Sequence, residues 1–421
     1  MKILFIADNF TPERNAQASR VFERACYWVK WGHQVTVITC APNFPEGAVF
    51  NGYQNRWHQV EEISGIRVVR VKTYIAANKG AARRILDFLS FMVTAFTTGL
   101  FESRPDLIVT TSPQFFAALG GLALSWVRRR PFVLELSDLW PDSIVAVGAM
   151  QKSVAIEWLE RLELFLYRRS ARIVALTNSF KANLVARGID PGKIDVVING
   201  VDLSRFQPGP QDPELAASLG ILPGDFVVGY IGTLGMAHGL QNVLDAAALM
   251  PAGSPVKFML VGPGAERETL VETALQRGLR NVIIAPAQPK DQIHRFWNLC
   301  SVALVHLKNT PLFKTVIPSK IFEAMGMALP IVLACPTGEG SHIIQSTGSG
   351  VCIAPEDPAA LAACVQRLAV DSTLYNELKT NSALSAPKYS REKQAFDMLS
   401  SLEAVFVEKS TTMKASYGVQ K

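Results

Sequence analysis

The sequence predicts an α/β protein made of two doubly wound parallel sheets. Short β-branched runs alternate with longer stretches of helical spacing through most of the 421 residues, which is typical of parallel strands covered by helices. The runs form two series, separated by a segment rich in Pro, Gly and Asp at 199–214. A chain of this length, with 49% hydrophobic residues, can bury a core in each of two domains.

The strands expected in each series follow from their apolar, β-branched composition. The first series is KILFIA, QVTVITC, IRVVRV, LIVTTS, FVLEL, RIVALT and IDVVIN, and the second is FVVGYIG, VKFMLVG, VIIAP, VALVHL, PIVLAC and GVCIA. We expect an N-terminal domain at 1–203 and a C-terminal domain at 204–387. The remainder, 388–421, is expected to hold a helix at about 391–409, able to return to the N-terminal domain, and then a flexible polar tail.

Positive charge is concentrated in the first half of the chain. Residues 1–200 carry 24 Lys and Arg against 17 Asp and Glu, whereas residues 201–421 carry 18 against 19. Arginine clusters lie at 83–84, 128–130 and 168–172. Such clusters suit an anionic membrane surface or phosphate-bearing substrates, and ordinary solvated faces remain an open alternative. No nucleic-acid reader motif accompanies them, so nucleic acid is not an expected partner.

The amino terminus and the cysteines predict a cytoplasmic location. MKILFIADNF enters a strand directly, without the cleavage region of a signal peptide. The six cysteines show no CxxC pair and no regular framework, so we expect reduced thiols, no disulfide and no zinc.

One apolar stretch, ILDFLSFMVTAFTTGLF at 85–101, raises the question of membrane contact. It falls short of the roughly 20 residues that a spanning helix needs, and it contains Asp87 and several threonines. A buried core helix and a helix at the membrane interface both fit, the latter because Arg83 and Arg84 precede it. We therefore expect a peripheral contact at most, at the inner face of the cytoplasmic membrane.

In parallel sheets ligands bind at the carboxyl ends of the strands, so the residues after each strand are candidate site residues. DNFTPERNAQASR, after the first strand, contains no glycine and so excludes a dinucleotide-binding GxGxxG turn there. Asn15 and Arg20 of this loop are able to face a ligand, or to lie on a plain surface loop. SDLWPDS, after FVLEL, places Asp138 at the strand end as a site residue or a helix cap, with Pro141 beginning the next helix.

The second series contains a glycine-bearing turn followed by an amphipathic helix, GYIGTLGMAHGLQNVLDAA. Gly232 and Gly235 let backbone amides approach a phosphate, and His238 is able to donate to the same anion. LVGPGAE, with Gly262 and Gly264, repeats the arrangement after the next strand. Glycines also serve simple turns, so these turns alone do not define a site.

PSKIFEAM places a lysine at a helix start, where free amides already favour an anion. Ser319 is expected to cap this helix, and Lys320 and Glu323 lie three residues apart on it. A surface ion pair worth about 0.3 to 0.5 kcal/mol would explain the spacing. The alternative assigns the two to different parts of one ligand, Lys320 to a diphosphate and Glu323 to ribose hydroxyls.

With these motifs in place, nearly the whole chain resembles the family-4 retaining glycosyltransferases of the GT-B fold, which have two Rossmann-like domains and an interdomain cleft. The resemblance is carried by NGVD at 199–202, GYIGTLGMAHGL at 229–240, LVGPG at 260–264 and PSKIFEAMGMALPIV at 318–332. Three further stretches, CAPNFPEGAVFNGYQNRW, TSPQFFAALGG and LSDLWPDS, are similar to a bacterial subgroup that assembles surface polysaccharides, including L-fucosamine transferases of O-antigen synthesis.

The resemblance implies that the second domain binds a nucleotide sugar, UDP-linked by likeness to the subgroup, and that the first binds the acceptor. The basic first domain and the apolar stretch at 85–101 suggest a lipid diphosphate-linked glycan as that acceptor. It implies catalytic roles for Asp138 and Lys320. The implied donor-side residues are Gly232, Thr233, Gly235, His238, Gly262, Gly264, Ala287, Pro318, Ser319, Lys320 and Glu323, and the implied acceptor-side residues are Arg14, Asn15, Ala16 and Arg20.

The chain departs from the family pattern at four places. Thr315 stands where the family's Glu-x7-Glu pair has its first carboxylate, and Ser137 stands where many relatives have histidine. The loop at 14–16 lacks the family's glycines. In addition, only His238 is available where many relatives have a basic Arg/Lys pair around the phosphate turn. The departures at Thr315 and Ser137 keep a non-catalytic relative open as an alternative. A nucleotide-sugar 2-epimerase is a second alternative, because the GT-B architecture also serves such enzymes.

The expected reaction needs no cofactor. No Asp-x-Asp triplet occurs, so we expect a metal-independent enzyme in which amides and Lys320 stabilise the leaving diphosphate. By family analogy the departing phosphate oxygen takes the proton of the acceptor hydroxyl, which then attacks on the same face.

Overall fold

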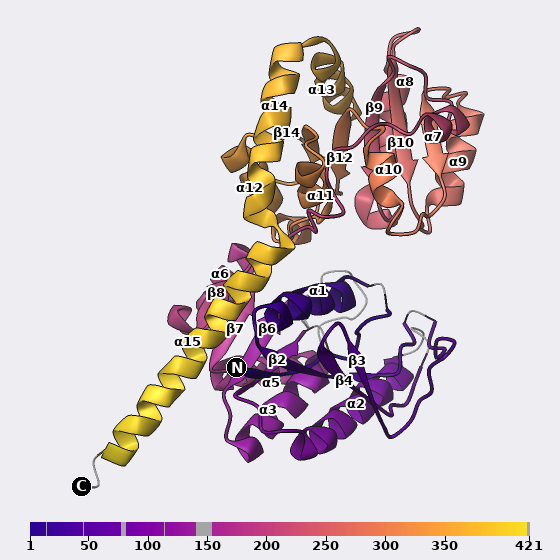
Figure 1. The fold of residues 1–421 in the computed structure, drawn as a ribbon. Coiled ribbons are helices and arrows are strands. Elements are labelled where there is room, and N and C mark those ends of the chain that lie inside the picture. The colour runs from indigo at the N-terminus through magenta and orange to yellow at the C-terminus, as the bar shows by residue number, and fades with distance from the viewer. Residues whose placement is uncertain (14, 45, 77–80, 113, 140–153, 419–421) are drawn as a thin grey trace. The chain divides into compact units, whose positions relative to one another are not determined.

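The computed structural model describes residues 1–13, 15–44, 46–76, 81–112, 114–139 and 154–418, with backbone alone at 81–82, 155 and 409–418 (Figure 1). It divides into two units, and each is described by itself. Unit 1 is Met1–Ile198 with Gln394–Lys421, and unit 2 is Asn199–Lys393. The boundaries at 198/199 and 393/394 lie a few residues from the expected positions, 203/204 and 387/388.

Unit 1 contains an eight-stranded sheet of order β3-β4-β2-β1-β5-β6-β7-β8. All neighbouring strands pair in parallel except β3 and β4, which are antiparallel. The strands are β1 (Lys2–Ile6), β2 (Gln34–Cys40), β3 (His58–Ile63), β4 (Ile66–Val71), β5 (Leu107–Thr111), β6 (Phe132–Leu136), β7 (Arg172–Ala175) and β8 (Ile194–Val196).

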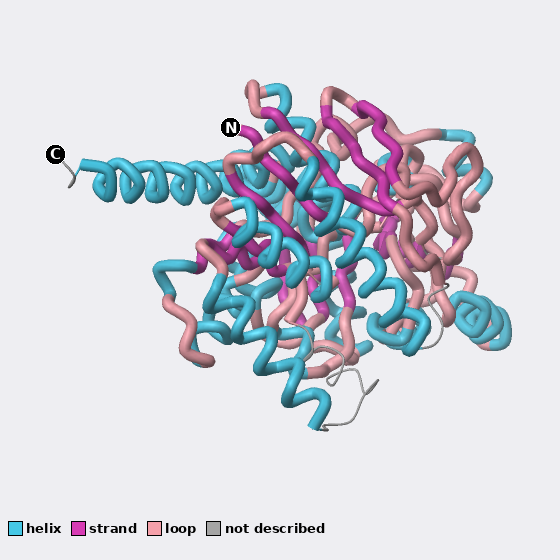
Figure 2. Tube along the Cα trace, turned by 90° about the horizontal axis from the view of Figure 1, so that it is seen from below, coloured by secondary structure: helices cyan, strands magenta, loops and turns pink. Residues whose placement is uncertain are grey.

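The central strands of this sheet are apolar because helices cover both of their faces. Every residue of β5 and β6 is buried, which explains why all of them are apolar or β-branched except Glu135 of β6. The helices are α1 (Ala16–Lys30), α2 (Ala81–Phe101), α3 (Phe115–Arg128), α5 (Val154–Arg169), α6 (Asn178–Ala186) and the 3-10 turn η1 (Pro191–Lys193). Figure 2 shows helices in cyan and strands in magenta along the chain.

The last helix, α15 (Arg391–Gly418), belongs largely to unit 1 and runs to the C-terminal end in Figure 2. Its apolar residues Ala395, Met398 and Leu402 are fully buried in the core beside α1. The indole Nε1 of Trp28 on α1 donates to the carbonyl oxygen of Ala395 at 2.9 Å. The helix continues to Gly418, beyond the expected end at about 409, whereas the flexibility of the tail stays a prediction.

Unit 2 contains a six-stranded, wholly parallel sheet of order β11-β10-β9-β12-β13-β14. The strands are β9 (Phe226–Ile231), β10 (Val256–Val261), β11 (Val282–Ala285), β12 (Val302–His306), β13 (Ile331–Ala334) and β14 (Gly350–Ile353). The helices are α7 (Pro213–Ser218), η2 (Met236–His238), α8 (Gln241–Ala248), α9 (Arg267–Gln276), α10 (Ile293–Trp297), η3 (Pro311–Lys314), α11 (Lys320–Gly326), α12 (Glu339–Thr347), α13 (Pro358–Val370), α14 (Ser372–Ser385) and η4 (Ala386–Tyr389).

The connector expected at 199–214 is attached to unit 2. Val201 forms a parallel bridge with Ser390, donating to Tyr389 and accepting from Arg391, each at 2.8 Å. A Cβ atom at Gly200 would lie 2.6 Å from the carbonyl oxygen of Ser390, so only glycine allows this close backbone approach. The NGVD motif therefore fixes the start of unit 2 to the segment that leads into α15.

Helix α2 is longer than its apolar run and lies against α3 (Figure 1). Phe91 and Ala95 are buried in the core of unit 1, whereas Val93 and Phe101 are 54% and 89% exposed. Among the described residues, Arg83–Phe101 is the one helical segment long and apolar enough to cross a membrane by length and composition. Since one side of α2 is packed on the protein and the other is not, it is not a core helix buried all round.

Candidate functional site

The side chain of Lys320, at the start of α11, reaches the carboxyl end of β9. Its Nζ lies 4.5 Å from the ring centroid of Tyr230. A Cβ atom at Gly232 would lie 2.5 Å from the Cε and 2.8 Å from the Nζ of Lys320. Gly232 also has a φ of +145°, in a region that L side chains rarely adopt. The backbone conformation thus requires glycine here, and the flexible end of Lys320 fills the space that a Cβ atom would occupy.

The Lys320 ammonium is half-buried and forms no salt bridge among the described residues. Burial lowers the pKa of Lys320 to about 8, although the carboxylate of Glu323 acts in the opposite direction. The ammonium lies over the Tyr230 ring, and the Glu323 carboxylate compensates its charge only in part, without a salt bridge. A half-buried cation whose charge is only partly compensated is costly, so this arrangement favours binding of an anion.

His238 lies next to the same aromatic ring. Its imidazole packs edge-on to Tyr230, with ring centroids 5.8 Å apart. Burial, and then the nearby Lys320 charge, lower the pKa of His238 to about 4, so the ring is neutral at pH 7. Its Nδ1 is buried and has no hydrogen-bond partner in the described part of the chain. As predicted from the sequence, His238 can offer a ligand one N–H group, but as a neutral donor and not as a cation.

Tyr230 contacts both Lys320 and His238, although the sequence did not indicate it as a site residue. Its ring is fully buried, and its hydroxyl donates to the carbonyl oxygen of Thr233 at 2.8 Å. An aromatic residue inside the apolar strand FVVGYIG resembles any core residue, so only its position two residues before Gly232 could have identified it.

Gly262 and Gly264 allow the loop after β10 to pack closely on the loop after β9. A Cβ atom at Gly262 would lie 2.0 Å from the carbonyl oxygen of Gly232, and one at Gly264 would lie 1.9 Å from that of Leu234. Both glycines thus allow close contact with the backbone of the first turn, and their sequence-based interpretation as a second phosphate approach stays a prediction. Gly235 differs from both, because its φ is −134° and the nearest atom to an added Cβ is 3.6 Å away.

Glu323 is half-buried on α11, one turn after Lys320. Burial raises the pKa of its carboxyl, and the charge of Lys320 opposes that shift. Its Oε2 accepts from the indole Nε1 of Trp297, a buried residue of α10, at 3.2 Å. Trp297 was not selected from the sequence, since a tryptophan at helical spacing usually indicates core. The indole leaves the other carboxylate oxygen available to a ligand hydroxyl.

Three other donor-side positions lie around these residues. Ser319 occupies the N-cap position of α11, but it is helical (φ −60°, ψ −25°) and its side chain makes no capping bond, so the capping prediction was wrong. Pro318, half-buried, precedes it, and Ala287 lies in an exposed loop after β11. At the departure from the family pattern, the hydroxyl of Thr315 donates to the carbonyl oxygen of Leu312 at 2.9 Å.

The acceptor-side residues belong to unit 1. Asn15 is the N-cap of α1, where its side chain accepts from the amide of Ala18 at 2.8 Å, and Ala16 is the first helical residue. Arg20 is 4% exposed, and its Nε lies 2.9 Å from Oε1 of the buried Glu135. The expectation that Arg20 faces a ligand is therefore corrected to a place in a buried ion pair. Arg14 lies outside the described residues.

Glu135 on β6 was missed by the sequence analysis, although it organises this part of unit 1. Its second oxygen pairs with the Nη2 of Arg24 at 2.9 Å, so one carboxylate holds two arginines of α1. Burial alone would raise the pKa of Glu135, but Arg24 and Arg20 hold it at about 2. A lone acidic residue inside FVLEL was the signal for such a partner.

Asp138 follows β6, as expected, and is half-buried. The hydroxyl oxygen of Ser112, at the end of β5, accepts from the amides of Ser137 at 2.9 Å and Asp138 at 3.3 Å. Ser137 in turn donates its hydroxyl to the carbonyl oxygen of Ser112. This network fixes the strand end that carries Asp138. Pro141, expected to begin the next helix, lies outside the described residues.

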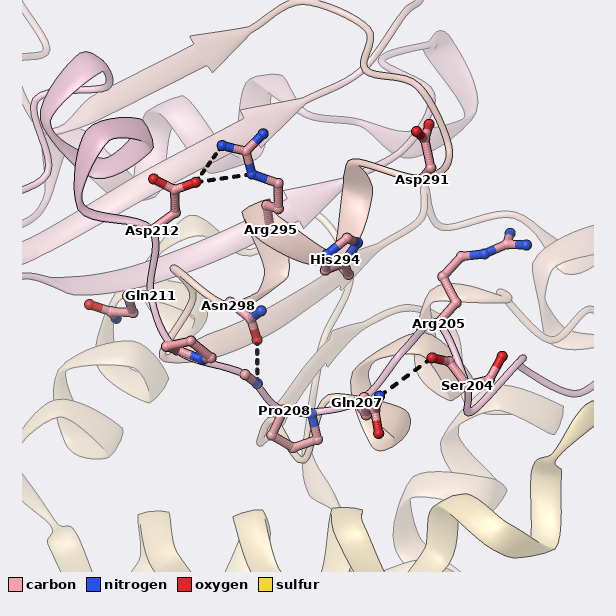
Figure 3. Close-up of a pocket in the computed structure, with 12 residues that line it drawn as sticks. Ser204, Arg205, Gln207, Pro208, Gln211, Asp212, Asp291, His294, Arg295 and Asn298 are labelled. Atoms are coloured by element: carbon pink, nitrogen blue, oxygen red, sulfur yellow. Dashed lines mark hydrogen bonds and ion pairs between the residues drawn. The ribbon is translucent and has the colours of Figure 1, made fainter.

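A pocket of about 580 Å3 lies elsewhere in unit 2, along the connector and α10 (Figure 3). It is lined by Arg205, His294 and Arg295, with Arg295 paired to Asp212. None of the donor-side residues lines it. We base the candidate site on the charge and geometry around Lys320, because this open groove has no comparable buried uncompensated charge. Across the described ranges, no group of three His, Cys, Asp or Glu side chains is placed to hold a metal ion.

Comparisons with known proteins match both halves of the chain. The glycosyl transferase 4-like domain family matches residues 15–200, and the glycosyl transferases group 1 family matches residues 211–384. WcaI of Escherichia coli, named for colanic acid biosynthesis, is 27% identical over 87% of this chain and 92% of its own length. WbjE of Pseudomonas aeruginosa, named as a glycosyltransferase, is 27% identical over 64% of this chain and 65% of its own.

Solved structures agree on the fold. HepE of Anabaena, in complex with UDP, superposes with a TM-score of 0.72 at 20% identity, covering 96% of this chain and 100% of its own. Sucrose-phosphate synthase of Thermosynechococcus elongatus gives a TM-score of 0.73 at 17% identity, covering 96% and 99%. The chain thus has the two-domain α/β architecture of GT-B enzymes, with one sheet in each unit. The chain is a glycosyltransferase, built from a glycosyl transferase 4-like domain and a glycosyl transferases group 1 domain.

Proposed function

We propose that this enzyme is a retaining glycosyltransferase that takes its sugar from a nucleoside diphosphate sugar, with uridine as the base. The observation that carries the proposal is the buried ammonium of Lys320, which has no salt bridge among the described residues and packs on Gly232 and Tyr230. A diphosphate supplies the missing negative charge. The complexes of HepE with UDP and with UDP-glucose support a uridine nucleotide in a protein of the same fold.

The chemistry of the main donor-side residues suggests which part of the donor each one binds. Lys320 and the turn amides near Gly232 bind the diphosphate, and His238 donates its one N–H to the same group. Glu323 accepts from ribose hydroxyls, since its Trp297 contact occupies only one oxygen. The exposed loop at Ala287 lies beside the base.

The reaction follows from the charge of the leaving group. The acceptor hydroxyl oxygen forms a bond to the anomeric carbon on the face from which the diphosphate leaves, while the bond from that carbon to the phosphate oxygen breaks. The hydroxyl proton passes to the departing phosphate oxygen, so no enzymic base is needed. Lys320 and the backbone amides stabilise the charge on the diphosphate without a divalent metal, and Asp138 orients the acceptor or the transferred sugar.

The acceptor we propose is a lipid diphosphate-linked glycan of bacterial O-antigen, capsule or exopolysaccharide synthesis. The names of WcaI and of TuaH, a Bacillus subtilis relative named for teichuronic acid biosynthesis, support surface polysaccharide as the product class. An N-acetyl-amino deoxy sugar such as L-FucNAc is the donor sugar that the motifs of the first domain favour.

A lipid-linked acceptor calls for a membrane contact at the inner face of the cytoplasmic membrane, and unit 1 has a suitable surface. We define the apolar face as the exposed side chains of α2, α3 and α5: Leu86, Val93, Phe101, Trp126, Val127, Trp158 and Phe165. Trp126 and Phe165 connect α3 and α5, with ring centroids 6.2 Å apart. Exposed tryptophan and phenylalanine beside arginine are typical of an interfacial surface.

Arginines border the apolar face. Arg84 stacks on Phe88 at 5.5 Å and Arg169 on Phe165 at 5.6 Å, so both keep their charge at the margin of the apolar side chains. Arg83, Arg161 and Arg168 are also exposed on α2 and α5. These positive charges favour contact with an anionic lipid surface, and each arginine near that surface contributes about 1 kcal/mol to the binding free energy.

Cosedimentation with vesicles tests the surface. We expect binding to phosphatidylglycerol vesicles at low salt, weaker binding at high salt, and little binding to phosphatidylcholine. The double variant Trp126→Ala, Trp158→Ala should lose most of the binding to phosphatidylglycerol vesicles. The control Trp57→Ala, which removes a tryptophan that is 72% exposed elsewhere in unit 1, should keep it. Absence of binding at low salt, or equal losses in both variants, would remove the membrane proposal.

Product formation tests the enzymatic proposal. Purified protein is incubated with several UDP-sugars and a panel of lipid-linked and water-soluble acceptors, and products are identified by mass spectrometry. We expect transfer to a lipid-linked acceptor without added metal, abolished by Lys320→Ala and kept by Lys379→Ala, which alters an exposed lysine of the same unit. Conversion of the nucleotide sugar in the absence of acceptor would instead identify a 2-epimerase, and transfer only to soluble acceptors would refute the lipid link.

A further inference from the structure

A buried histidine lies directly behind the turn that carries His238. His306 ends β12 and is fully buried. Its Nδ1 donates to the carbonyl oxygen of His238 at 2.6 Å, and its Nε2 lies 2.9 Å from the Nδ2 of Asn242, a residue of α8 that is 7% exposed. One imidazole therefore connects three elements, the end of β12, the turn at 235–239 and the helix that follows it.

The hydrogen bonds fix the tautomer of His306. A carbonyl oxygen only accepts, so Nδ1 carries the proton. Burial lowers the pKa of His306, so the ring is neutral at pH 7 and its Nε2 accepts from the Asn242 amide. Both ring nitrogens are satisfied inside the protein, which leaves His306 no atom with which to bind a ligand itself.

The main chain adds a second attachment at the same place. The amide of Lys308 donates to the carbonyl oxygen of Ala237 at 3.0 Å. Gly239 has a φ of +56°, and a Cβ atom there would lie 3.4 Å from Cε1 of His306 and 3.2 Å from Cγ of Lys308. The turn is therefore held against the end of β12 at Ala237 and His238 and packs closely on it at Gly239.

These contacts determine which polar groups the 235–239 turn can present to a diphosphate. Carbonyl oxygens that faced a diphosphate would repel it, whereas amide N–H groups attract it. The carbonyls of Ala237 and His238 are engaged by the end of β12, so they are not free to turn toward the anion. The His238 ring meanwhile stays on Tyr230, whose own ring lies beneath the Lys320 ammonium.

We propose that His306, supported by Asn242, is a positioning residue for the donor: it holds the 235–239 turn in the conformation that binds the diphosphate. It acts through the turn and touches neither substrate nor reacting atoms. The inference rests on the proposed function, because it assigns the turn to the donor diphosphate. It also explains a buried polar pair in a sheet whose other strand-end residues are apolar.

Two substitutions at this position separate positioning from simple packing. In His306→Asn, the carboxamide Nδ2 occupies nearly the place of the imidazole Nδ1 and can still donate to the His238 carbonyl. In His306→Phe, a ring of similar size fills the space and donates nothing. We expect His306→Phe to weaken UDP binding about tenfold, measured by calorimetry, and His306→Asn to remain within about threefold of the wild type.

Val302→Ala provides the matched control, because it removes buried volume from the same strand away from the turn. It should lower the melting temperature and leave UDP affinity unchanged. Hydrogen exchange of the amides at 235–239, measured without nucleotide, should be faster in His306→Phe than in the control. If His306→Phe does not fold, Asn242→Leu removes the second bond and should weaken UDP binding by a smaller factor.

The outcomes distinguish the inference from the function on which it rests. Wild-type protein that binds no nucleoside diphosphate would refute the proposed function. Wild-type protein that binds UDP, with His306→Phe and Asn242→Leu binding it equally well, would refute the positioning role alone. Equal losses of affinity in His306→Phe, His306→Asn and Val302→Ala would also refute it, since they would indicate loss of packing and not of the hydrogen bond.

Discussion

Replacement of Lys320 by methionine should have opposite effects on stability and on ligand binding. The pKa of Lys320 is about 8 in the folded protein against an ordinary value of 10.5, so burial of the charged form costs the folded state about 3 kcal/mol at pH 7. Methionine has a similar length and no charge. The unliganded variant should therefore have a higher free energy of unfolding than the wild type, by up to about 3 kcal/mol before losses from altered packing.

The sign of the pH effect follows from the lowered pKa. Between pH 8 and 10.5 the unfolded chain holds a proton on this lysine more tightly than the folded protein does, so the contribution of Lys320 to stability rises with pH in that window. The advantage of Lys320→Met should be greatest at and below pH 8 and should shrink toward pH 10.5. Urea titrations of both proteins across this range measure it.

Ligand binding should change the other way. Loss of the ammonium should weaken UDP binding, and the stabilisation of the transition state for transfer, by about 2 to 4 kcal/mol. Calorimetry and the rate of transfer measure the two losses. A variant that is less stable than the wild type without ligand, yet binds UDP equally well, would show that the lysine is a structural residue and refute the reasoning.

Three further predictions follow from the same contacts. UDP affinity should fall about fivefold from pH 8 to pH 9 in calorimetric titrations, because the unliganded Lys320 deprotonates above its pKa of about 8, and a flat profile would contradict this. Gly232→Ala should abolish UDP binding and lower the melting temperature, since its Cβ would lie 2.5 Å from Lys320 Cε. Gly235→Ala should preserve the fold, because the nearest atom to its Cβ would be 3.6 Å away. Equal melting temperatures of the two variants would contradict this prediction. Glu135→Gln should lower the free energy of unfolding, measured in urea, by about 3 to 5 kcal/mol, because it leaves Arg20 and Arg24 buried without their shared carboxylate. A loss no larger than that of the exposed Glu157→Gln would contradict the role given to this ion pair.

The sequence predicted both sheets because buried parallel strands need unbroken apolar or β-branched runs, and such runs are visible without any partner. Strand β3 was missed for the converse reason. Its sequence HQVEEI alternates half-buried and exposed residues at the edge of the sheet, where polar side chains are tolerated. Periodicity therefore identifies the covered strands and not this antiparallel edge.

The candidate site was predicted in part. Lys320, Gly232 and His238 were each selected from local motifs, and the structure brings all three to the end of β9 around Tyr230. Their mutual contacts could not be predicted, because they depend on which strands are neighbours. Arg20 was misassigned for the same reason, since its partner Glu135 lies 115 residues away in the chain.

The capping prediction at Ser319 failed on backbone conformation. A serine caps a helix when its own φ and ψ are extended, whereas Ser319 is already helical. The packing role of the two further glycines could not be predicted from the sequence. Gly262 and Gly264 pack against the carbonyls of Gly232 and Leu234, an approach that no local motif specifies.

A crystal structure of the enzyme with UDP tests the central claim most directly. The account predicts a diphosphate oxygen within about 2.7 to 3.0 Å of the Lys320 Nζ, with the ribose hydroxyls on the Glu323 carboxylate. A nucleotide bound elsewhere, for example in the groove of Arg205, His294 and Arg295, with the Lys320 ammonium still on Tyr230 and without an anion, would contradict it.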